Sequence, residues 1–526
     1  MESIKVNKIA DKNITTKDII EITKGTLISG NENTVCKNFS KDTRTIEKGD
    51  IYIGIKGENF DGNLFWDKAL DNGALGVIVQ DIEFSKEEIE KYKDKVIIKV
   101  EDTLQALYEI ASYKRDMYDI PVIAITGSVG KTSTKDIVAN VVSQKYKTLK
   151  TKGNNNNNIG LPFTILNAEN DIEAMVLEMG MNHFGEIHLL SEIAKPNICI
   201  ITNIGTSHIG NLGSRENILK AKLEILDGTQ NPYIIINNDN DLLHKWYEEN
   251  KDKYNVKTYG IKNKSDIMAE DINLQEEYSE FKISYNYDLS KKSEEMSERD
   301  NSNFNTYKSI YENRNESTEK ITNKHIDESK NESTDKNINE EKIKIPVGGE
   351  HFILNSLCAI SVGEKIGVKN EDIKNGIETF ELTKNRMEVT ELKNGIKIIN
   401  DAYNSSVESV KATLEYMNTM KANRRIAVLG DVLETGEFAK ELHEKIGEVV
   451  CKNNIDILIC NGENSKYIIQ RAKEQGMNKD NIYYLENRED IVDLIKQIVE
   501  PNDVILFKAS NGMKFFEIAE KIKQII

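Results

Sequence analysis

The sequence lacks any hydrophobic run long enough to cross a membrane, since no apolar stretch approaches the ~18 residues that a transmembrane helix needs. Its first residues, MESIKVNKIADKN, contain no apolar segment of the kind found in signal peptides. An excess of basic residues is also missing. The 526 residues carry a net charge of −17, which argues against a protein that binds nucleic-acid phosphates. We therefore expect a cytoplasmic protein with no membrane insertion and no nucleic-acid partner.

Cysteine is scarce, and its spacing matches no metal site. The five cysteines are scattered, with no pair at the spacing of metal ligands: Cys36, Cys199, Cys358, Cys451 and Cys460. Reduced, buried thiols in a reducing compartment are the simplest interpretation. Hydrophobic residues make up 38% of the sequence, and a chain of this length has enough of them for about two to four domains.

One internal segment, residues 288–340, has a composition unlike the rest of the chain. It is rich in Asn, Ser, Glu and Lys and poor in apolar residues, so it cannot bury enough surface to offset the entropy lost on ordering. The stretches on either side, FKISYNY from Phe281 and EKIKIPV from Glu341, have the composition of strands. We therefore predict a disordered insertion in an enlarged hairpin loop of one domain, not a linker between two domains.

The rest of the chain divides into three predicted domains of the α/β class. Residues 1–100 mix short strands such as IYIGIKG (from Ile51) with helices, whereas residues 101–383 alternate buried strands with helices from PVIAITG (Pro121) onward. Residues 384–526 show the same alternation, which is typical of parallel sheets with crossover helices. The third domain is thus expected to be Rossmann-like, but it contains no GxGxxG, so no dinucleotide is assigned to it.

The segment TGSVGKTS, between the strand PVIAI and a helix, has the features of a phosphate-binding loop. Gly127 and Gly130 allow backbone N–H groups to surround an anion. Lys131 supplies positive charge for the terminal phosphates of ATP, and the Thr132 hydroxyl can bind Mg²⁺. The loop is two residues shorter than the common form, because Ile125 stands where the first glycine is usual. We assign the following residues to ATP binding: Gly127, Ser128, Val129, Gly130, Lys131, Thr132 and Ser133.

Two polar residues follow the next strands of the central domain. Glu178 ends the apolar strand AMVLE, and His208 follows the strand ICIIT. Because ligands bind where the carboxyl ends of parallel strands meet, we expect both side chains near the phosphate-binding loop. A carboxylate and an imidazole at this place could hold a second cation beside the reacting phosphate.

Lys222 lies on the apolar stripe of the predicted helix in ENILKAKLEILDG. The other face of that helix repeats charged residues at intervals of four: Glu216, Lys220 and Glu224. Burial among apolar neighbours would lower the pKa of Lys222, and its neutral amine could then add carbon dioxide to become a carbamate. A lysine that extends its ammonium into water is the alternative at this point.

Together these motifs resemble those of the Mur ligases of peptidoglycan synthesis. Four longer runs carry the resemblance: KGNNNNNIGLP from Lys152, EMGMNHFGEI from Glu178, NDAYNSSVES from Asn400 and VLGDVLETGE from Val428. It covers nearly the whole chain except residues 288–340. The resemblance implies a monomeric enzyme that uses ATP to activate a carboxylate as an acyl phosphate and joins it to an amine. The implied cofactors are ATP, two Mg²⁺ ions and a carbamylated Lys222.

Within the family, these runs are similar to those of the member whose substrates are UDP-N-acetylmuramoyl-tripeptide and D-alanyl-D-alanine. The resemblance implies a small mixed α/β first domain that binds the UDP-sugar through DTR and IKGENFDG, with help from the asparagine run. The residues implied for binding this substrate are Asp42, Thr43, Arg44, Lys56, Gly57, Asn154, Asn156 and Asn157. The residues implied for the incoming dipeptide are Lys508 and Ser510.

The resemblance also implies roles at the nucleotide. Asn355 would contact the adenine, and Arg386 would reach the γ-phosphate from the third domain. The other implied nucleotide contacts are Asp401, Tyr403 and Asn404. The implied metal-binding residues are Thr132, Glu178, His208 and Lys222. The residues implied for catalysis are Lys131, Lys222, His208 and Arg386.

Three positions depart from the family pattern. Asn385 replaces the usual glycine before Arg386, and Val407 replaces a proline. KASN replaces KGSR, so Asn511 stands where an arginine would otherwise be suited to clamp a carboxylate. The third departure bears directly on the assignment of the dipeptide site.

Two other functions remain open from the sequence alone. One is a sister amide ligase, such as a folylpolyglutamate synthase, with the same central domain. The other is a P-loop switch ATPase, which would need no carboxylate substrate. DTR and KGENFDG argue against the folate enzyme, because it is not expected to need a UDP-sugar module.

Overall fold

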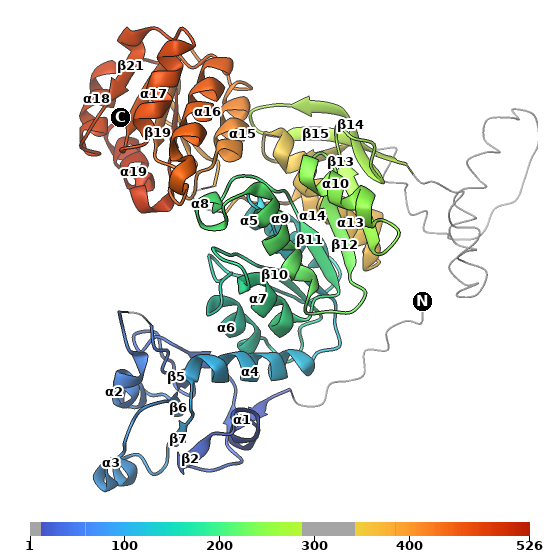
Figure 1. The fold of residues 1–526 in the computed structure, drawn as a ribbon, viewed down its shortest axis with the longest axis vertical. Coiled ribbons are helices and arrows are strands. Elements are labelled where there is room, and N and C mark those ends of the chain that lie inside the picture. Colours follow the sequence, from blue (N-terminus) through green and yellow to red (C-terminus); the bar gives the residue numbers. More distant parts are fainter. Residues whose placement is uncertain (1–11, 58, 287–341, 384–385) are drawn as a thin grey trace, which may run out of the picture.

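The computed structural model describes residues 12–57, 59–286, 342–383 and 386–526 of the protein (Figure 1). These residues form three main β-sheets with helices around them, and the central sheet lies between the other two (Figure 1). The predicted α/β class with a three-domain architecture is confirmed. Its boundaries near residues 100 and 383 stay a prediction. The insertion at 288–340 lies outside the described residues, as does Asn385.

The first sheet has five strands in the order β2-β7-β6-β5-β4, and its neighbouring strands are parallel except for the β2–β7 pair. Strands β5 and β6 are apolar and fully buried, as central strands should be. Strands β1 and β3, from the same part of the chain, form a separate two-stranded antiparallel sheet. The strands are β1 (Ile14–Thr15), β2 (Thr26–Ser29), β3 (Val35–Cys36), β4 (Phe39–Ser40), β5 (Ile51–Ile53), β6 (Gly76–Val79) and β7 (Val96–Lys99). The helices are α1 (Thr16–Thr23), η1 (Gly62–Phe65), α2 (Trp66–Asp71), α3 (Lys86–Lys91) and α4 (Thr103–Asp116).

The central sheet has nine strands among the described residues, in the order β16-β15-β14-β13-β12-β11-β8-β10-β9. It is parallel from β9 to β14 and antiparallel at β15 and β16. Helices cross over between the successive strands from β8 to β13, whereas a short segment without a helix joins β13 to β14. The strands are β8 (Val122–Thr126), β9 (Thr148–Lys150), β10 (Ala174–Glu178), β11 (Ile198–Ile201), β12 (Tyr233–Asn237), β13 (Asn255–Gly260), β14 (Ile267–Leu274), β15 (Ser279–Tyr285) and β16 (Ile343–Ile345). The helices are α5 (Lys131–Val142), α6 (Gly160–Leu166), α7 (Glu186–Ala194), α8 (Ile209–Leu212), α9 (Arg215–Leu223), η2 (Glu224–Leu226), α10 (Asp241–Asn250), α13 (Glu350–Lys365) and α14 (Asn370–Glu378).

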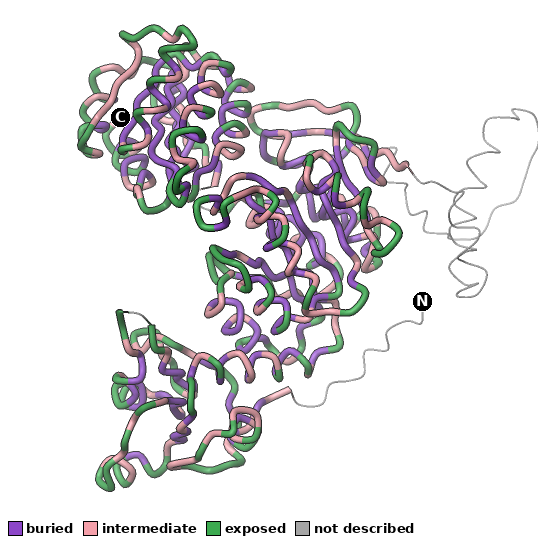
Figure 2. Tube along the Cα trace, in the orientation of Figure 1, coloured by how far each residue is buried: buried purple, intermediate pink, exposed green. Residues whose placement is uncertain are grey.

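The continuous apolar runs of the central strands explain their position. Strands β8, β10 and β11 are buried at every residue, and Figure 2 shows the buried residues running along the central sheet. Strand β8 lies between β10 and β11, so the segments that follow these three strands meet at one edge. The strands on either side of residues 288–340 pair antiparallel, with Phe281 opposite Ile343, which confirms the predicted hairpin.

The third sheet has six strands in the order β17-β18-β22-β19-β20-β21, parallel except for the β17–β18 pair. This is the Rossmann-like alternation that the sequence predicts. The strands are β17 (Glu388–Glu391), β18 (Lys397–Asn400), β19 (Arg425–Gly430), β20 (Ile457–Asn461), β21 (Ile482–Tyr484) and β22 (Val504–Lys508). The helices are η3 (Lys393–Gly395), α15 (Val407–Met417), η4 (Gly436–Phe438), α16 (Ala439–Lys452), α17 (Ser465–Glu474), η5 (Lys479–Asn481), α18 (Asp490–Ile498), η6 (Asn511–Met513) and α19 (Phe515–Ile525). Over the part of the chain that the structure describes, no helix combines the length and apolar character of a membrane span.

Candidate active site

The phosphate-binding loop connects β8 to α5 and depends on its two glycines. Gly127 has φ 153° and Gly130 has φ 80°, backbone conformations that residues with a side chain rarely adopt. A Cβ atom on Gly127 would also lie 1.9 Å from the Thr202 hydroxyl oxygen. The loop therefore passes close to the end of β11, and α5 begins directly after it at Lys131.

The segment after β11 holds the loop in place. The Ser128 N–H donates to the Asn203 carbonyl at 3.0 Å, and the Val129 N–H donates to the Asn203 side-chain oxygen at 3.0 Å. The Thr202 hydroxyl donates to the Val129 carbonyl at 2.8 Å. Two of the N–H groups that we expected to face an anion are therefore bonded to Asn203. The N–H groups of the first turn of α5 remain as the backbone donors for a phosphate.

Lys131 lies inside the cavity and within reach of a phosphate. Its ammonium donates to the Gly127 carbonyl at 2.8 Å. Burial lowers the pKa of Lys131, Glu178 opposes this shift, and Arg386 adds to it. A bound anion would relieve the loss of solvation, so this lysine is suited to bind the terminal phosphates.

Glu178 has the surroundings of a cation ligand. Only 1% of the residue is exposed. One carboxylate oxygen accepts from the Thr132 hydroxyl at 3.2 Å and from the Asn156 amide at 2.8 Å. The other oxygen is buried with no hydrogen-bond partner in the described structure. An uncompensated carboxylate oxygen beside a threonine hydroxyl fits Mg²⁺, which prefers such oxygen ligands.

His208 lies at the boundary with the third domain. Its Nδ1 is 2.5 Å from a carboxylate oxygen of Glu434, and this hydrogen bond lowers the pKa of Glu434. His208 is not among the residues that line the cavity at the phosphate-binding loop. In the described parts of the chain, no three His, Cys, Asp or Glu side chains gather closely enough to hold a metal ion. The metal-binding role of His208 stays a prediction.

Lys222, on α9, is 1% exposed. Burial lowers the pKa of its amine well below the usual lysine value, and repulsion by Lys131 lowers it further. A lysine that extends its ammonium into water would be far more exposed, so the structure favours a neutral buried amine.

The side of the cavity expected to hold adenine is formed by α13. The Asn355 side-chain oxygen accepts from the Thr134 hydroxyl at 3.0 Å, whereas its buried amide nitrogen has no partner in the described structure. One helical turn earlier, His351 lines the same cavity, and burial lowers the pKa of its ring to about 4. His351 was missed in the sequence, although its spacing of four from Asn355 in GGEHFILNSL places both on one helix face.

Arg386 connects the third domain to the phosphate-binding loop. Its guanidinium carbon is 4.0 Å from the centre of the Tyr403 ring, and its Nη2 donates to the Thr132 hydroxyl at 3.4 Å. The stacking on Tyr403 restrains the guanidinium plane. Arg386 thereby brings a positive charge from beyond the central domain to the phosphate-binding loop.

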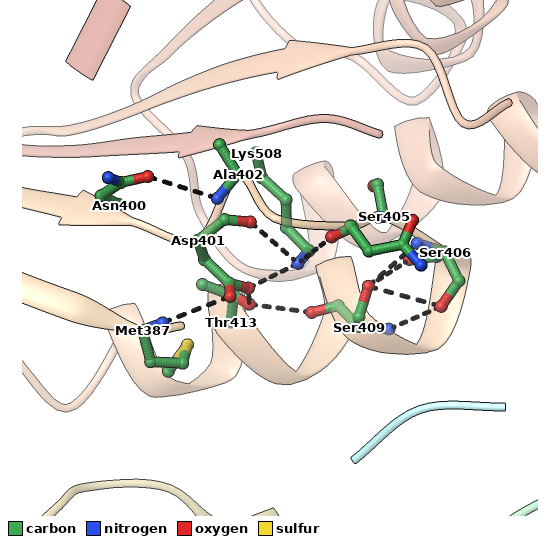
Figure 3. A network of polar contacts seen from close by, with 10 residues as sticks. Met387, Asn400, Asp401, Ala402, Ser405, Ser406, Ser409, Thr413 and Lys508 are labelled. Atoms are coloured by element: carbon green, nitrogen blue, oxygen red, sulfur yellow. Dashed lines mark hydrogen bonds and ion pairs between the residues drawn. The ribbon is translucent and has the colours of Figure 1, made fainter. Parts of the chain in front are cut away.

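A buried network in the third domain joins Asp401 to Lys508 (Figure 3). The Lys508 ammonium is 2.5 Å from an Asp401 carboxylate oxygen and donates to the Asn404 carbonyl at 3.2 Å. The Thr413 hydroxyl donates to the same Asp401 oxygen at 2.7 Å. Lys508, 1% exposed, therefore has its charge balanced within the domain. The Ser510 hydroxyl accepts from the Leu433 N–H at 2.9 Å. The dipeptide roles of both residues stay predictions.

The central and third domains line one cavity together. It contains most of the nucleotide residues expected from the sequence, including Lys131, Thr132, Asn355, Arg386 and Asp401. Lys508 also lines it, as does Glu408, which the sequence did not predict and which accepts from the Thr206 hydroxyl at 3.0 Å.

The first domain has a separate shallow pocket. The DTR residues lie in its wall, where Arg44 binds both oxygens of Asp42 at 2.9 and 2.7 Å and holds the pKa of that carboxyl at about 2. Phe60, which belongs to the predicted IKGENFDG run, stacks with Phe65, which the sequence did not predict. Their ring centres are 5.1 Å apart, and Phe60 is 60% exposed. The remaining lining residues are Lys41, Tyr52 and Lys68.

Five of the eight residues predicted for the UDP substrate lie outside this pocket: Lys56, Gly57, Asn154, Asn156 and Asn157. Lys56 is exposed and forms an ion pair with Asp81 at 3.3 Å, while the Gly57 N–H donates to the Phe60 carbonyl. In the asparagine run, the Asn157 side chain accepts from the Gly160 N–H at 2.8 Å at the start of α6, and Asn154 is exposed.

Comparison with known proteins agrees with this arrangement. Three family models match: Mur ligase family, catalytic domain (residues 37–115), Mur ligase middle domain (125–297) and Mur ligase, glutamate ligase domain (385–511). The UDP-N-acetylmuramoyl-tripeptide–D-alanyl-D-alanine ligase of Bacillus subtilis (strain 168) is 33% identical, over 97% of this chain and 98% of its own. The chain belongs to the Mur ligase family.

Solved structures of Mur ligases share its fold. Crystal structure I of MurF from Acinetobacter baumannii superposes with a TM-score of 0.78 at 23% identity, covering 97% of this chain and 99% of that one. The MurF ligase from Thermotoga maritima, in complex with ADP, gives a TM-score of 0.71 at 25% identity, covering 93% and 97%. Membership of the Mur ligase family, expected from the TGSVGKTS loop and the four longer runs, is thus confirmed.

Proposed function

We propose that this Mur ligase joins D-alanyl-D-alanine to UDP-N-acetylmuramoyl-tripeptide, with ATP converted to ADP and phosphate. The observation that carries the proposal is the cavity in which Lys131, Asn355 and Arg386 meet, in a chain that matches a ligase of this name along its length. The reaction consumes ATP, so we place it in the cytoplasm. We also propose that it acts as a monomer.

ATP lies in the cavity between the central and third domains. Its adenine lies against α13, where the unpaired amide of Asn355 and the neutral ring of His351 can bond to ring nitrogens. Its terminal phosphates lie at the N-terminus of α5 beside Lys131. Mg²⁺, when bound, neutralises phosphate charge and orients the terminal phosphate. Thr132 and Glu178 would hold it, since a Glu178 oxygen is buried and unpaired.

The first chemical step brings two anions together. The tripeptide carboxylate attacks the γ-phosphorus of ATP, the bond to the bridging oxygen breaks, and ADP leaves an acyl phosphate behind. Lys131 from the loop and Arg386 from the third domain place positive charge on either side of the transferred group. This arrangement lowers the repulsion in the transition state.

The second step forms the amide bond. The neutral amine of the dipeptide attacks the acyl carbon, phosphate leaves, and one proton is released. Water would hydrolyse the acyl phosphate, so the third domain must cover it during the reaction. Holding the amine beside the activated carbonyl can itself remove on the order of 7–11 kcal/mol of the barrier.

The function is tested by measuring phosphate release while each substrate is omitted in turn. We expect release only when ATP, UDP-N-acetylmuramoyl-tripeptide and D-alanyl-D-alanine are all present. Release that is indifferent to both peptide substrates would favour a switch ATPase. Turnover with a folate and glutamate in their place would favour the sister ligase.

The first-domain pocket is proposed to bind the uridine end of the substrate, with the base stacked on Phe60. Replacing Phe60 with alanine removes this surface. Stacking on an aromatic ring contributes about 1–3 kcal/mol per base, so the KM for the UDP substrate should rise by about 5- to 150-fold. The kcat should change little, because the chemistry occurs elsewhere.

Steady-state kinetics with the UDP substrate varied measures this effect. Leu64→Ala is the matched control, since Leu64 is 66% exposed on the short helix η1, four positions after Phe60, but does not line the pocket. If the Phe60→Ala variant kept the KM of wild type, Phe60 would not be part of the binding site.

A further inference from the structure

One face of α5 carries three polar side chains at intervals of four residues: Thr132, Asp136 and Asn140. Residues spaced in this way lie above one another on a helix. All three contact the segment that leaves α14 for the third domain. The Asn140 amide donates to the Gly376 carbonyl at 2.6 Å and to Thr379 at 3.1 Å. Thr379, Thr383 and Arg386 are therefore held at successive points along α5, in the direction of the phosphate-binding loop.

The middle contact joins Thr383 to Asp136. The Thr383 hydroxyl donates to an Asp136 carboxylate oxygen at 2.6 Å. The other oxygen of Asp136 is 2.9 Å from the Lys150 ammonium and 3.2 Å from that of Lys135. Lys135 is in turn held by the Thr151 carbonyl at 2.8 Å. Both carboxylate oxygens of Asp136 are therefore held by neighbouring side chains.

The charge state of Asp136 makes the contact strong. The residue is 6% exposed, and burial alone raises the pKa of its carboxyl. The ammonium groups of Lys135 and Lys150, together with the Thr383 hydroxyl, lower that pKa by more, so the net shift is downward. Asp136 is therefore ionised and only accepts hydrogen bonds. A hydroxyl bonded to a carboxylate is held more firmly than one bonded to a neutral group.

The contact lies three residues before Arg386. The Arg386 N–H donates to the Thr383 carbonyl at 3.2 Å. The contact between Thr383 and α5 therefore fixes the position of the Arg386 backbone. From there the guanidinium reaches the Tyr403 ring and the Thr132 hydroxyl. If Thr383 moves along α5, Arg386 moves away from the terminal phosphate.

We propose that Asp136 and Thr383 are positioning residues that fix Arg386 against the phosphate-binding loop. Neither residue lines the shared cavity, so both act through Arg386. This role rests on the proposed function, in which Arg386 stabilises phosphoryl transfer. The same pair also fixes the start of the third domain relative to α5, so it sets the arrangement in which the shared cavity is complete.

The Thr383→Val variant tests the role, because valine keeps the shape of threonine but has no hydroxyl. We expect kcat to fall by about 10-fold or more, since small displacements of a reacting group can cost that much. The KM for the UDP substrate should remain near that of wild type, because the first-domain pocket is unchanged. Thr383→Ser, which keeps the hydroxyl, should restore most of the kcat.

The matched control is Thr379→Val. Thr379 is another exposed threonine of the same segment; its hydroxyl contacts Asn140 instead of Asp136 and lies further from Arg386 in sequence. Its kcat should stay within about twofold of wild type. Equal losses of kcat in the two valine variants would overturn the proposal in favour of a general loss of stability.

A double mutant distinguishes action through Arg386 from an independent effect. In an Arg386→Ala background, Thr383→Val should cause no further loss of kcat, because the residue that it positions is gone. Losses that multiply would overturn the proposal.

Hydrogen exchange keeps this test separate from the test of function. The Arg386 amide should exchange faster in Thr383→Val than in wild type or Thr383→Ser. Equal exchange rates of the Arg386 amide in these proteins would contradict the positioning role, whatever reaction the enzyme catalyses. Faster exchange in a protein without ligase activity would instead leave the contact standing and overturn the proposed function.

Discussion

The Lys222→Ala variant is expected to lose about 10³-fold in turnover, the scale of removing a major electrostatic group from an active site. Lys222 is 1% exposed and its pKa is lowered well below the usual lysine value. Its neutral amine can therefore add carbon dioxide, forming an N–C bond and releasing one proton to give a carbamate. The ammonium of Lys131, which repels a charged Lys222, would attract this anion. Carbamylation thus changes an unfavourable contact at the phosphate site into a favourable one.

Carbon-13 NMR with labelled bicarbonate measures the modification itself. Wild-type protein should show a carbamate signal that is absent from Lys222→Ala. Small carboxylates such as formate should restore part of the variant's activity, because they can fill the space with a negative charge. Lys220→Ala is the control, since Lys220 is exposed two residues away on the same helix. Normal turnover by Lys222→Ala would show that the carbamate has no role.

The parts of the site that could be predicted from the sequence are those encoded locally. TGSVGKTS combines a buried strand, two glycines and a helix start within one short run, and the structure has all three in that order. Glu178 ends a strand that is buried at every position, so sheet topology alone places it beside the loop. For Lys222, helical spacing placed the residue on the apolar stripe but left open whether its ammonium reaches water; the structure buries it.

Contacts between distant segments could not be predicted in this way. His208 is bonded to Glu434, 226 residues later in the chain, and Thr383 is bonded to Asp136, 247 residues earlier. Neither pairing leaves a trace in periodicity or composition, because each depends on how segments far apart in the sequence come together in the folded chain. Lys508 is a further example. Its motif suggested an ammonium that could bind the dipeptide, whereas the structure pairs this ammonium with Asp401. The contacts between distant segments, more than the folds of the single domains, are therefore what the sequence alone does not predict.

Replacing Lys131 with alanine is expected to lower kcat/KM for ATP by about 10²- to 10³-fold. Within the cavity, the Ser128 and Val129 N–H groups are bonded to Asn203, so the loop has fewer backbone donors for the phosphates than its sequence suggests. More of the charge on the transferred group must therefore be balanced by Lys131 and Arg386. The loss should exceed that of a surface lysine by a wide margin, because the site is buried and little water can replace the ammonium.

Phosphate release with ATP varied, together with direct binding of each substrate, measures this effect. Lys131→Ala should still bind the UDP substrate with the affinity of wild type, since Phe60 and the DTR residues lie in a separate pocket. Lys145→Ala is the matched control, because Lys145 is exposed just beyond the far end of α5 and contacts the Gly367 carbonyl at 2.8 Å. If both variants retained wild-type rates, the loop would not be the site of phosphoryl transfer. If Lys131→Ala lost binding of the UDP substrate as well, the two pockets would not be independent, and the division of labour between the first and central domains would be wrong.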